Sequence, residues 1–142
     1  MNRYADPRGY RTAIYRPGDE RRLELRADMA RDFDAEDGRL PEGPKWTLWR
    51  GARPVGIGGV EPDGEGWFLT EDLSARDWVA AVHASRACLA WLRGRKMVRR
   101  VVALVEPGHH AARRMLAKLG FELDQVGHVP GRSWSMVWEA ER

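Results

Sequence analysis

The chain has 142 residues, of which 43% are hydrophobic and 32% charged, which excludes a disordered chain and favours one compact, soluble domain. A formal net charge of +3, among 24 basic and 21 acidic residues, gives little reason to expect a nucleic acid as partner. The single cysteine, Cys88, excludes an internal disulfide. Because Met1 to Arg16 has no apolar signal region, we expect cytoplasmic synthesis. No stretch approaches the roughly 18 apolar residues that a membrane span needs, so we expect none.

The first elements are predicted to be a strand followed by a helix. The strand runs from Tyr10 to Tyr15 and stops at Pro17-Gly18. Asp19 then opens a helix that continues to about Asp34. The apolar stripe of this helix recurs at every fourth residue, namely Leu25, Met29 and Phe33.

A meander of three strands is predicted next. The segments Lys45 to Arg50 and Pro54 to Val60 read as an antiparallel hairpin around Gly51-Ala52, and Gly66 to Thr70 follows as a third strand. The second strand is rich in glycine, so we expect close packing against its backbone.

The second half of the chain is predicted to hold two helices between strands. Ser74 and Asp77 form a capping box for a helix that ends at Gly94, and a buried strand follows from Val98 to Val105. A helix from His109 to Leu119 comes next. Strands close the chain at Phe121 to Leu123 and at Trp134 to Trp138, where Trp134, Met136 and Trp138 share a face suited to the core or to a subunit contact. This order of elements indicates an α/β (α+β) fold with a mixed sheet covered by helices.

Two segments carry a family resemblance. The apolar strand Val98 to Val105, a break at Pro107-Gly108, a short helix and Leu119-Gly120-Phe121 resemble a strand-helix-"LGF" signature. The hairpin Trp46 to Val60 is similar to a "dG-x-pVG" hairpin. Both of these patterns are signatures of the GNAT superfamily of N-acetyltransferases, which the chain therefore resembles. The resemblance implies one GNAT-like domain over residues 1–142, with a mixed, mostly antiparallel sheet and a central parallel strand pair that splays apart.

The resemblance also implies where acetyl-CoA would bind. The pantetheine arm would bond the backbone of Phe68, Leu69 and Thr70, at the free edge of one splayed strand. The pyrophosphate would meet the start of the following helix, at Ser74, Ala75 and Arg76. The family's glycine-rich loop is replaced here by Thr70 to Asp77, which has no glycine and three acids. This segment reads first as a helix cap, because the acids would repel a pyrophosphate.

The last helix departs from the family pattern as well. Counting back from Gly120-Phe121 puts His109 where the family has Asn and Leu116 where it has the Tyr that protonates the thiolate; Ala112 lies between them as expected. His109 either contacts the cofactor or donates a proton, or it is a solvent-facing residue of a first helical turn. Glu61, Glu65 and Glu71 are candidates for a general base, although each reads first as a turn or rim charge near a strand end.

Three functions remain open from the sequence. The first is acyl-CoA-dependent transfer to an amine on a small molecule or a protein. The second is a non-catalytic binding module, for which phage structural proteins in a virion are candidate partners, since Trp67 to Asp72 resembles small phage GNAT-like proteins. The third is nucleic-acid binding, which rests only on the basic cluster Arg93, Arg95, Lys96, Arg99 and Arg100. The cluster could also hold a CoA phosphate, and it reads first as a solvated helix-to-strand connection.

Overall fold

Seven strands form one mixed sheet in a computed structural model that describes residues 4–106, 108–124 and 134–140, without the side chains of residues 28, 32 and 134. The order across the sheet is β1-β2-β3-β4-β5-β7-β6. The strands are β1 (Tyr10–Ile14), β2 (Lys45–Arg50), β3 (Arg53–Val60), β4 (Glu65–Thr70), β5 (Arg100–Val105), β6 (Glu122–Leu123) and β7 (Trp134–Glu139). The helical elements are the 3-10 helix η1 (Asp19–Arg22), α1 (Ala27–Ala35), α2 (Ala75–Gly94) and α3 (His110–Lys118).

The strands β4 and β5 form the parallel pair that the sequence led us to expect at the centre of the sheet. The other neighbouring strands run antiparallel. The parallel pair is short, with only Glu65 opposite Val102 and Gly66 opposite Ala103. Beyond Gly66, β4 continues to Thr70 and β5 to Val105 without pairing, so the two strands part at their C-terminal ends. The prediction of a splayed pair is confirmed.

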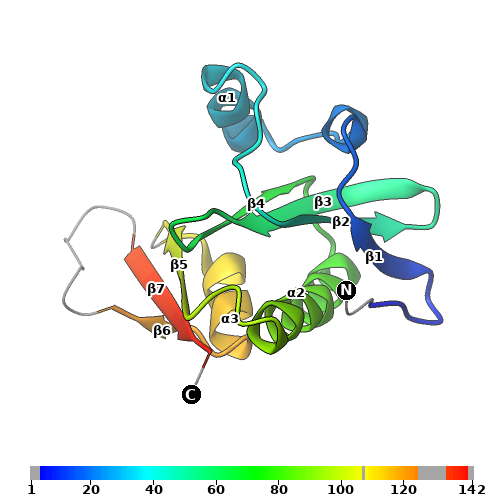
Figure 1. Cartoon of the computed structure of the whole chain (residues 1–142). Coiled ribbons are helices and arrows are strands. Elements are labelled where there is room, and N and C mark those ends of the chain that lie inside the picture. The colour runs from blue at the N-terminus through cyan, green and yellow to red at the C-terminus, as the bar shows by residue number, and fades with distance from the viewer. Residues whose placement is uncertain (1–3, 107, 125–133, 141–142) are drawn as a thin grey trace.

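Helices cover both faces of the sheet (Figure 1), with α2 and α3 on one face and η1 and α1 on the other. The α2 face holds two clusters of buried side chains. One joins β2 and β3 to β5, β7 and the C-terminal half of α2, and the other joins β1 to β3 with the N-terminal half of α2. The opposite face has a smaller cluster in which Leu23, Ile57 and Leu69 are buried beneath α1. Leu104 on β5 is 58% exposed, so the expectation of a fully buried strand there is wrong.

The helix predicted from Asp19 to Asp34 is wrong, because the structure divides it into η1 and α1. Between them the chain is extended, with Leu23 at φ −81° and ψ 136°. The Leu23 side chain is buried with Ile57 and Leu69, and the Arg26 amide donates to the Thr70 carbonyl. These contacts with the sheet use an amide that a continuous helix would have bonded internally, so tertiary packing overrides the local pattern.

The predicted helix ends are confirmed where the structure describes them. Ser74 and Asp77 form a reciprocal capping box at the start of α2. Gly120 follows α3 with φ +94°, a left-handed conformation that favours glycine. Met136 and Trp138 belong to the core. Pro107, the loop Gly127 to Arg132 and the Trp134 side chain lie outside the described residues. Within the described ranges, no helix combines the length and apolar character that crossing a membrane requires.

Candidate functional site

The splayed edge of β4 presents the main-chain groups of alternate residues. The Glu71 amide donates to Val55 of β3, whereas Val102 of β5 donates to the Gly64 carbonyl on the other edge of the strand. Because main-chain groups alternate along a strand, Phe68 and Thr70 face the gap left by β5, and Leu69 faces β3. Of the three residues predicted to bond a pantetheine arm, only Phe68 and Thr70 therefore point their backbone into the splay. Leu69 instead packs its side chain against α1.

The two splay-facing residues differ in their present contacts. β5 has parted from β4 before it reaches Phe68, so the Phe68 amide and carbonyl have no ladder partner in the part of the chain that the structure describes. The main-chain groups of Thr70 are in contact with Arg26, just before α1, and with Met29 in the first turn of α1. The Thr70 amide lies 3.2 Å from Met29 Sδ, and the Thr70 carbonyl accepts from the Arg26 amide at 3.4 Å.

Arg26 connects the two sides of the splay. Its Nη1 lies 2.6 Å from His109 Nε2, at the start of α3, and its Nε lies 3.7 Å from the Asp72 carboxylate. Arg26 and Met29 were not expected at the site, because the sequence pattern placed them inside a helix that faced the core. No spacing in the sequence signals that the chain turns back along Thr70.

The start of α2 carries two amides without an internal partner. Ser74 caps the helix and its hydroxyl accepts from the Asp77 amide at 3.2 Å. The amides of Ala75 and Arg76 precede the first internal helical bond, and neither donates to a described acceptor. With the helix dipole behind them, they form a local site for an anion. Ser74, Ala75 and Arg76, the predicted pyrophosphate residues, are all exposed to solvent.

Two of the three acids near this helix end are neutralised by arginines. Glu71 is buried, and its Oε2 accepts from Arg53 at 2.7 Å and from the Glu24 amide at 3.0 Å. Asp77 is 3% exposed and accepts from Arg50 at 2.9 Å. The third, Asp72, is exposed and lies near Arg26. The repulsion of an anion expected from the sequence is therefore largely compensated.

Asp77 is held ionised by its neighbours. Burial by itself would raise the pKa of this carboxyl. Hydrogen bonds from the Tyr10 hydroxyl at 2.5 Å, from the Ser74 amide at 3.0 Å and from Arg50 outweigh burial and lower the pKa below its usual range. Asp77 thus ties β1 and β2 to the start of α2.

His109 is the N-cap of α3. Its Nδ1 accepts from the Ala112 amide at 3.2 Å, and its ring meets Trp78 edge-on with centroids 6.1 Å apart. The residue is half-buried, so it faces solvent only in part, and its contact with a cofactor stays a prediction. A neutral imidazole accepts a hydrogen bond at only one of its nitrogens. Because Ala112 and Arg26 both bring donors, one of these two contacts is unsatisfied. The side chain of Ala112 contributes no polar group.

No described tyrosine or glutamate lies ready for proton transfer in the splay. Leu116 packs against the core next to α2. Glu61 and Glu65 flank the paired end of β4, away from the opening, and Glu71 is bonded to Arg53. Cys88 is buried, which raises the pKa of its thiol to about 12 and leaves it unsuited as a nucleophile at neutral pH.

Three arginines of the basic cluster contact aromatic rings or a carboxylate of the same chain. Arg93 lies over the Trp138 ring and Arg95 over the Trp91 ring, at 5.2 and 5.4 Å from the ring centroids. Arg100 lies 3.9 Å from Asp124. These contacts favour the interpretation of a helix-to-strand connection, and binding of a phosphate by this cluster stays a prediction.

The structure is similar to those of GNAT-family acetyltransferases. A ribosomal-protein-S5-alanine acetyltransferase from Vibrio fischeri has a TM-score of 0.66 at 11% identity, with 98% of this chain and 97% of that chain covered. A GNAT-family acetyltransferase from Bacillus anthracis has a TM-score of 0.66 at 12% identity, with both chains fully covered. An aminoglycoside acetyltransferase in complex with coenzyme A has a TM-score of 0.51 at 19% identity, over 69% of this chain and 66% of that chain.

The chain therefore has the fold of the GNAT acetyltransferases. No family model matches the sequence. No curated protein matches it significantly. At identities this low the structural likeness shows the fold and leaves the activity to be argued from the site.

Proposed function

We propose that the chain transfers an acyl group from acyl-CoA to an amine, with acetyl-CoA the first donor to test. The observation that carries the proposal is the opening between β4 and β5. Among the described residues, the Phe68 amide and carbonyl have no strand partner there, and two amides at the start of α2 have no acceptor. Acyl-CoA fits these two sets of groups. Its pantetheine arm carries amides that can bond the backbone of β4, and its pyrophosphate needs hydrogen-bond donors such as the amides at the start of α2.

The residues of this chain divide the binding between them. Phe68 and, once Met29 withdraws, Thr70 would bond the pantetheine amides. Ala75 and Arg76 would hold the pyrophosphate. The cofactor, when bound, supplies the activated acyl thioester. The acceptor, a small-molecule or protein amine, stays a prediction.

The chain's own contribution to the reaction is positioning and polarisation. A main-chain amide of β4 that points into the splay is a fixed donor for a thioester carbonyl and costs no reorganisation. Leu116 cannot protonate a thiolate, and the described carboxylates lie elsewhere or are paired. His109 is a titratable group near the splay, with its Nε2 beside Arg26. Proton transfer through solvent is therefore expected, together with slow turnover.

Ala75→Pro provides a sharp test of cofactor binding. Position 75 is the first residue of α2, where proline is tolerated, and Ser74 has the extended conformation (φ −68°, ψ 169°) that a following proline requires. The substitution removes one amide and leaves the capping box intact. We expect calorimetry to show that acetyl-CoA binds at least about tenfold more weakly, because the variant loses one hydrogen bond to the charged pyrophosphate.

Ala75→Ser is the matched control, because it keeps the amide and should bind like the native chain. Both variants should unfold at the native temperature. Release of free thiol from acetyl-CoA in the presence of amines then measures turnover. If the native chain shows no heat and no thermal shift with acetyl-CoA or CoA at about 1 mM, the proposed function is wrong.

A non-catalytic module is the second candidate, favoured by Leu116 and by the occupation of Thr70 by Arg26 and Met29. In that case CoA would bind without turnover, or the splay would stay closed. Phage structural proteins as partners and association with a virion stay predictions, and the structural neighbours described above lend them no support.

A further inference from the structure

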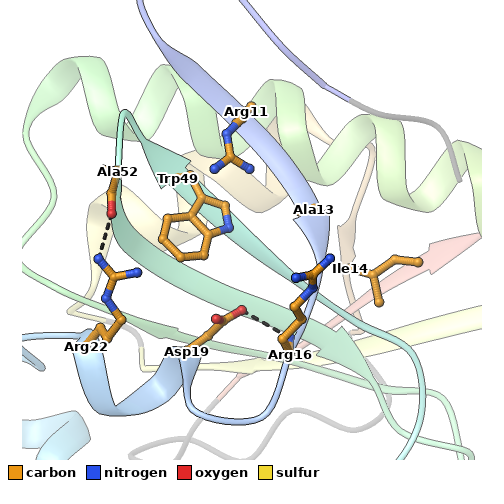
Figure 2. A pocket seen from close by; sticks show the side chains of 8 residues that line it. All are labelled: Arg11, Ala13, Ile14, Arg16, Asp19, Arg22, Trp49 and Ala52. Carbon is orange, nitrogen blue, oxygen red and sulfur yellow. Dashed lines mark hydrogen bonds between the residues drawn. The ribbon is translucent and has the colours of Figure 1, made fainter.

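A second candidate site lies on the α1 face of the sheet, at its β1 edge. There a pocket of about 500 Å³ opens between β1, η1 and the β2–β3 turn (Figure 2). β1 is separated from β4 by β2 and β3, so the pocket is distinct from the splay. Its lining consists of Arg11, Ala13, Ile14, Arg16, Asp19, Arg22, Trp49 and Ala52.

Three arginines surround the pocket, and none of them is paired with a carboxylate among the described residues. Arg11 and Arg22 lie over the Trp49 ring, with guanidinium carbons 5.1 and 5.2 Å from its centroid. Arg22 also donates to the Ala52 carbonyl at 2.7 Å. Contacts with an aromatic ring and a carbonyl orient a guanidinium without cancelling its charge.

The one acid in the lining, Asp19, is hydrogen-bonded to neighbouring residues of the fold. Asp19 is buried, and its Oδ2 accepts from the Thr47 hydroxyl at 2.7 Å and from the Arg16 amide at 3.1 Å. Three arginines against this one carboxylate leave 3 − 1 = +2 charges on the lining.

We propose that this pocket binds a phosphate monoester carried by a small molecule. A phosphate monoester has a charge of about −1.5 to −2 at neutral pH, which matches the lining, whereas a single carboxylate has only half of it. The planar forks of arginine suit phosphate oxygens. A volume near 500 Å³ lies within the usual range for small-molecule sites, so the pocket holds more than the phosphate itself.

Titration calorimetry with AMP, adenosine and inorganic phosphate tests this assignment. We expect AMP to bind, adenosine to give no heat, and inorganic phosphate to bind more weakly than AMP. Arg11→Gln should weaken AMP binding about tenfold, since the Arg11 side chain is exposed and contributes a charge, while the pairing of Arg11 with Trp49 uses the backbone, which glutamine keeps. Arg114→Gln is the matched control: it removes the same charge from an exposed position on α3 and should leave AMP binding unchanged.

Several results would overturn the proposal. These are no AMP binding at about 1 mM, equal binding of adenosine and AMP, or equal losses in the two arginine variants. Displacement of AMP by dephospho-CoA, which has the pantetheine arm and pyrophosphate but no phosphate monoester, would place the nucleotide in the splay. Binding of a phosphoserine peptide without binding of AMP would assign the site to a protein-borne phosphate. Thermal unfolding of both variants at the native temperature excludes misfolding as the cause.

Discussion

Asp77 shows how one side chain can serve both the fold and the site. It caps α2, accepts from Tyr10 on β1 and pairs with Arg50 on β2. The same contacts compensate a negative charge next to the amides of Ala75 and Arg76. Asp77→Asn keeps the shape but removes the charge. We expect chemical denaturation to show a free energy of unfolding lower by about 1–3 kcal/mol.

The pH dependence of stability should change in the same variant. The pKa of Asp77 is lowered in the folded chain, so its stabilisation is complete above the ordinary carboxyl pKa of about 4 and is lost as the pH falls through the folded value. We expect the native chain to lose more stability than Asp77→Asn between neutral pH and about pH 3. Parallel loss in both proteins would show that other carboxylates dominate. Tyr10→Phe, which removes one of the hydrogen bonds that lower the pKa of Asp77 and no charge, should show a pH dependence between those of the native chain and Asp77→Asn.

His109 offers a test that separates helix capping from a role at the splay. His109→Ala removes the cap of α3 and should cost about 0.5–2 kcal/mol of unfolding free energy. Asparagine is a strong N-cap residue, so His109→Asn should restore the stability while it removes the contact with Arg26. Denaturation measures the first effect, and acetyl-CoA turnover measures the second. If His109→Asn does not restore the free energy of unfolding, the contacts of His109 with Arg26 and Trp78 stabilise the fold more than the cap does.

At the scale of elements, the strands and the capped helix α2 could be predicted because their signals are local. Alternation, the glycine after α3 and the pair Ser74 and Asp77 each act within a few residues. The segment from Leu23 to Arg26 could not be predicted, because its conformation is set by β4, more than 40 residues away. The same non-local contact places Arg26 and Met29 at the splay, which is why the site was only partly predicted.

The segment leading into α1 should compete with a ligand for the splay. The Arg26 amide bonds the Thr70 carbonyl and the Arg26 side chain contacts His109, so acyl-CoA must displace Arg26 or bind beside it. We expect Arg26→Ala to bind CoA about three- to tenfold more tightly by calorimetry, because the splay no longer has to open against the side-chain contacts with His109 and Asp72, although the backbone bond to Thr70 remains. Arg31→Ala, at an exposed position of α1, should bind like the native chain. Weaker binding by Arg26→Ala would mean that Arg26 itself holds the cofactor.

At the scale of the molecule, the splay divides the sheet into two halves that share few hydrogen bonds. β1 to β4 form one half and β5 to β7 the other, with only two residue pairs between them. The halves are joined instead by the core beneath α2. There Trp46 and Val60 from the first half meet Val101 and Trp138 from the second, together with Leu92. An opening for a ligand is therefore compatible with a stable sheet, because side-chain packing replaces strand pairing.

Leu92→Ala tests whether this core makes the two halves unfold together. Leu92 is fully buried, so its truncation should lower the free energy of unfolding by about 2–5 kcal/mol. Because both halves rest on the same cluster, we expect fluorescence and circular dichroism to report one coincident transition in the native chain and in the variant. Val79→Ala on the same helix, 41% exposed, should change stability by no more than about 0.5 kcal/mol. Two separate transitions in Leu92→Ala would show that the halves are stable independently and that α2 only bridges them.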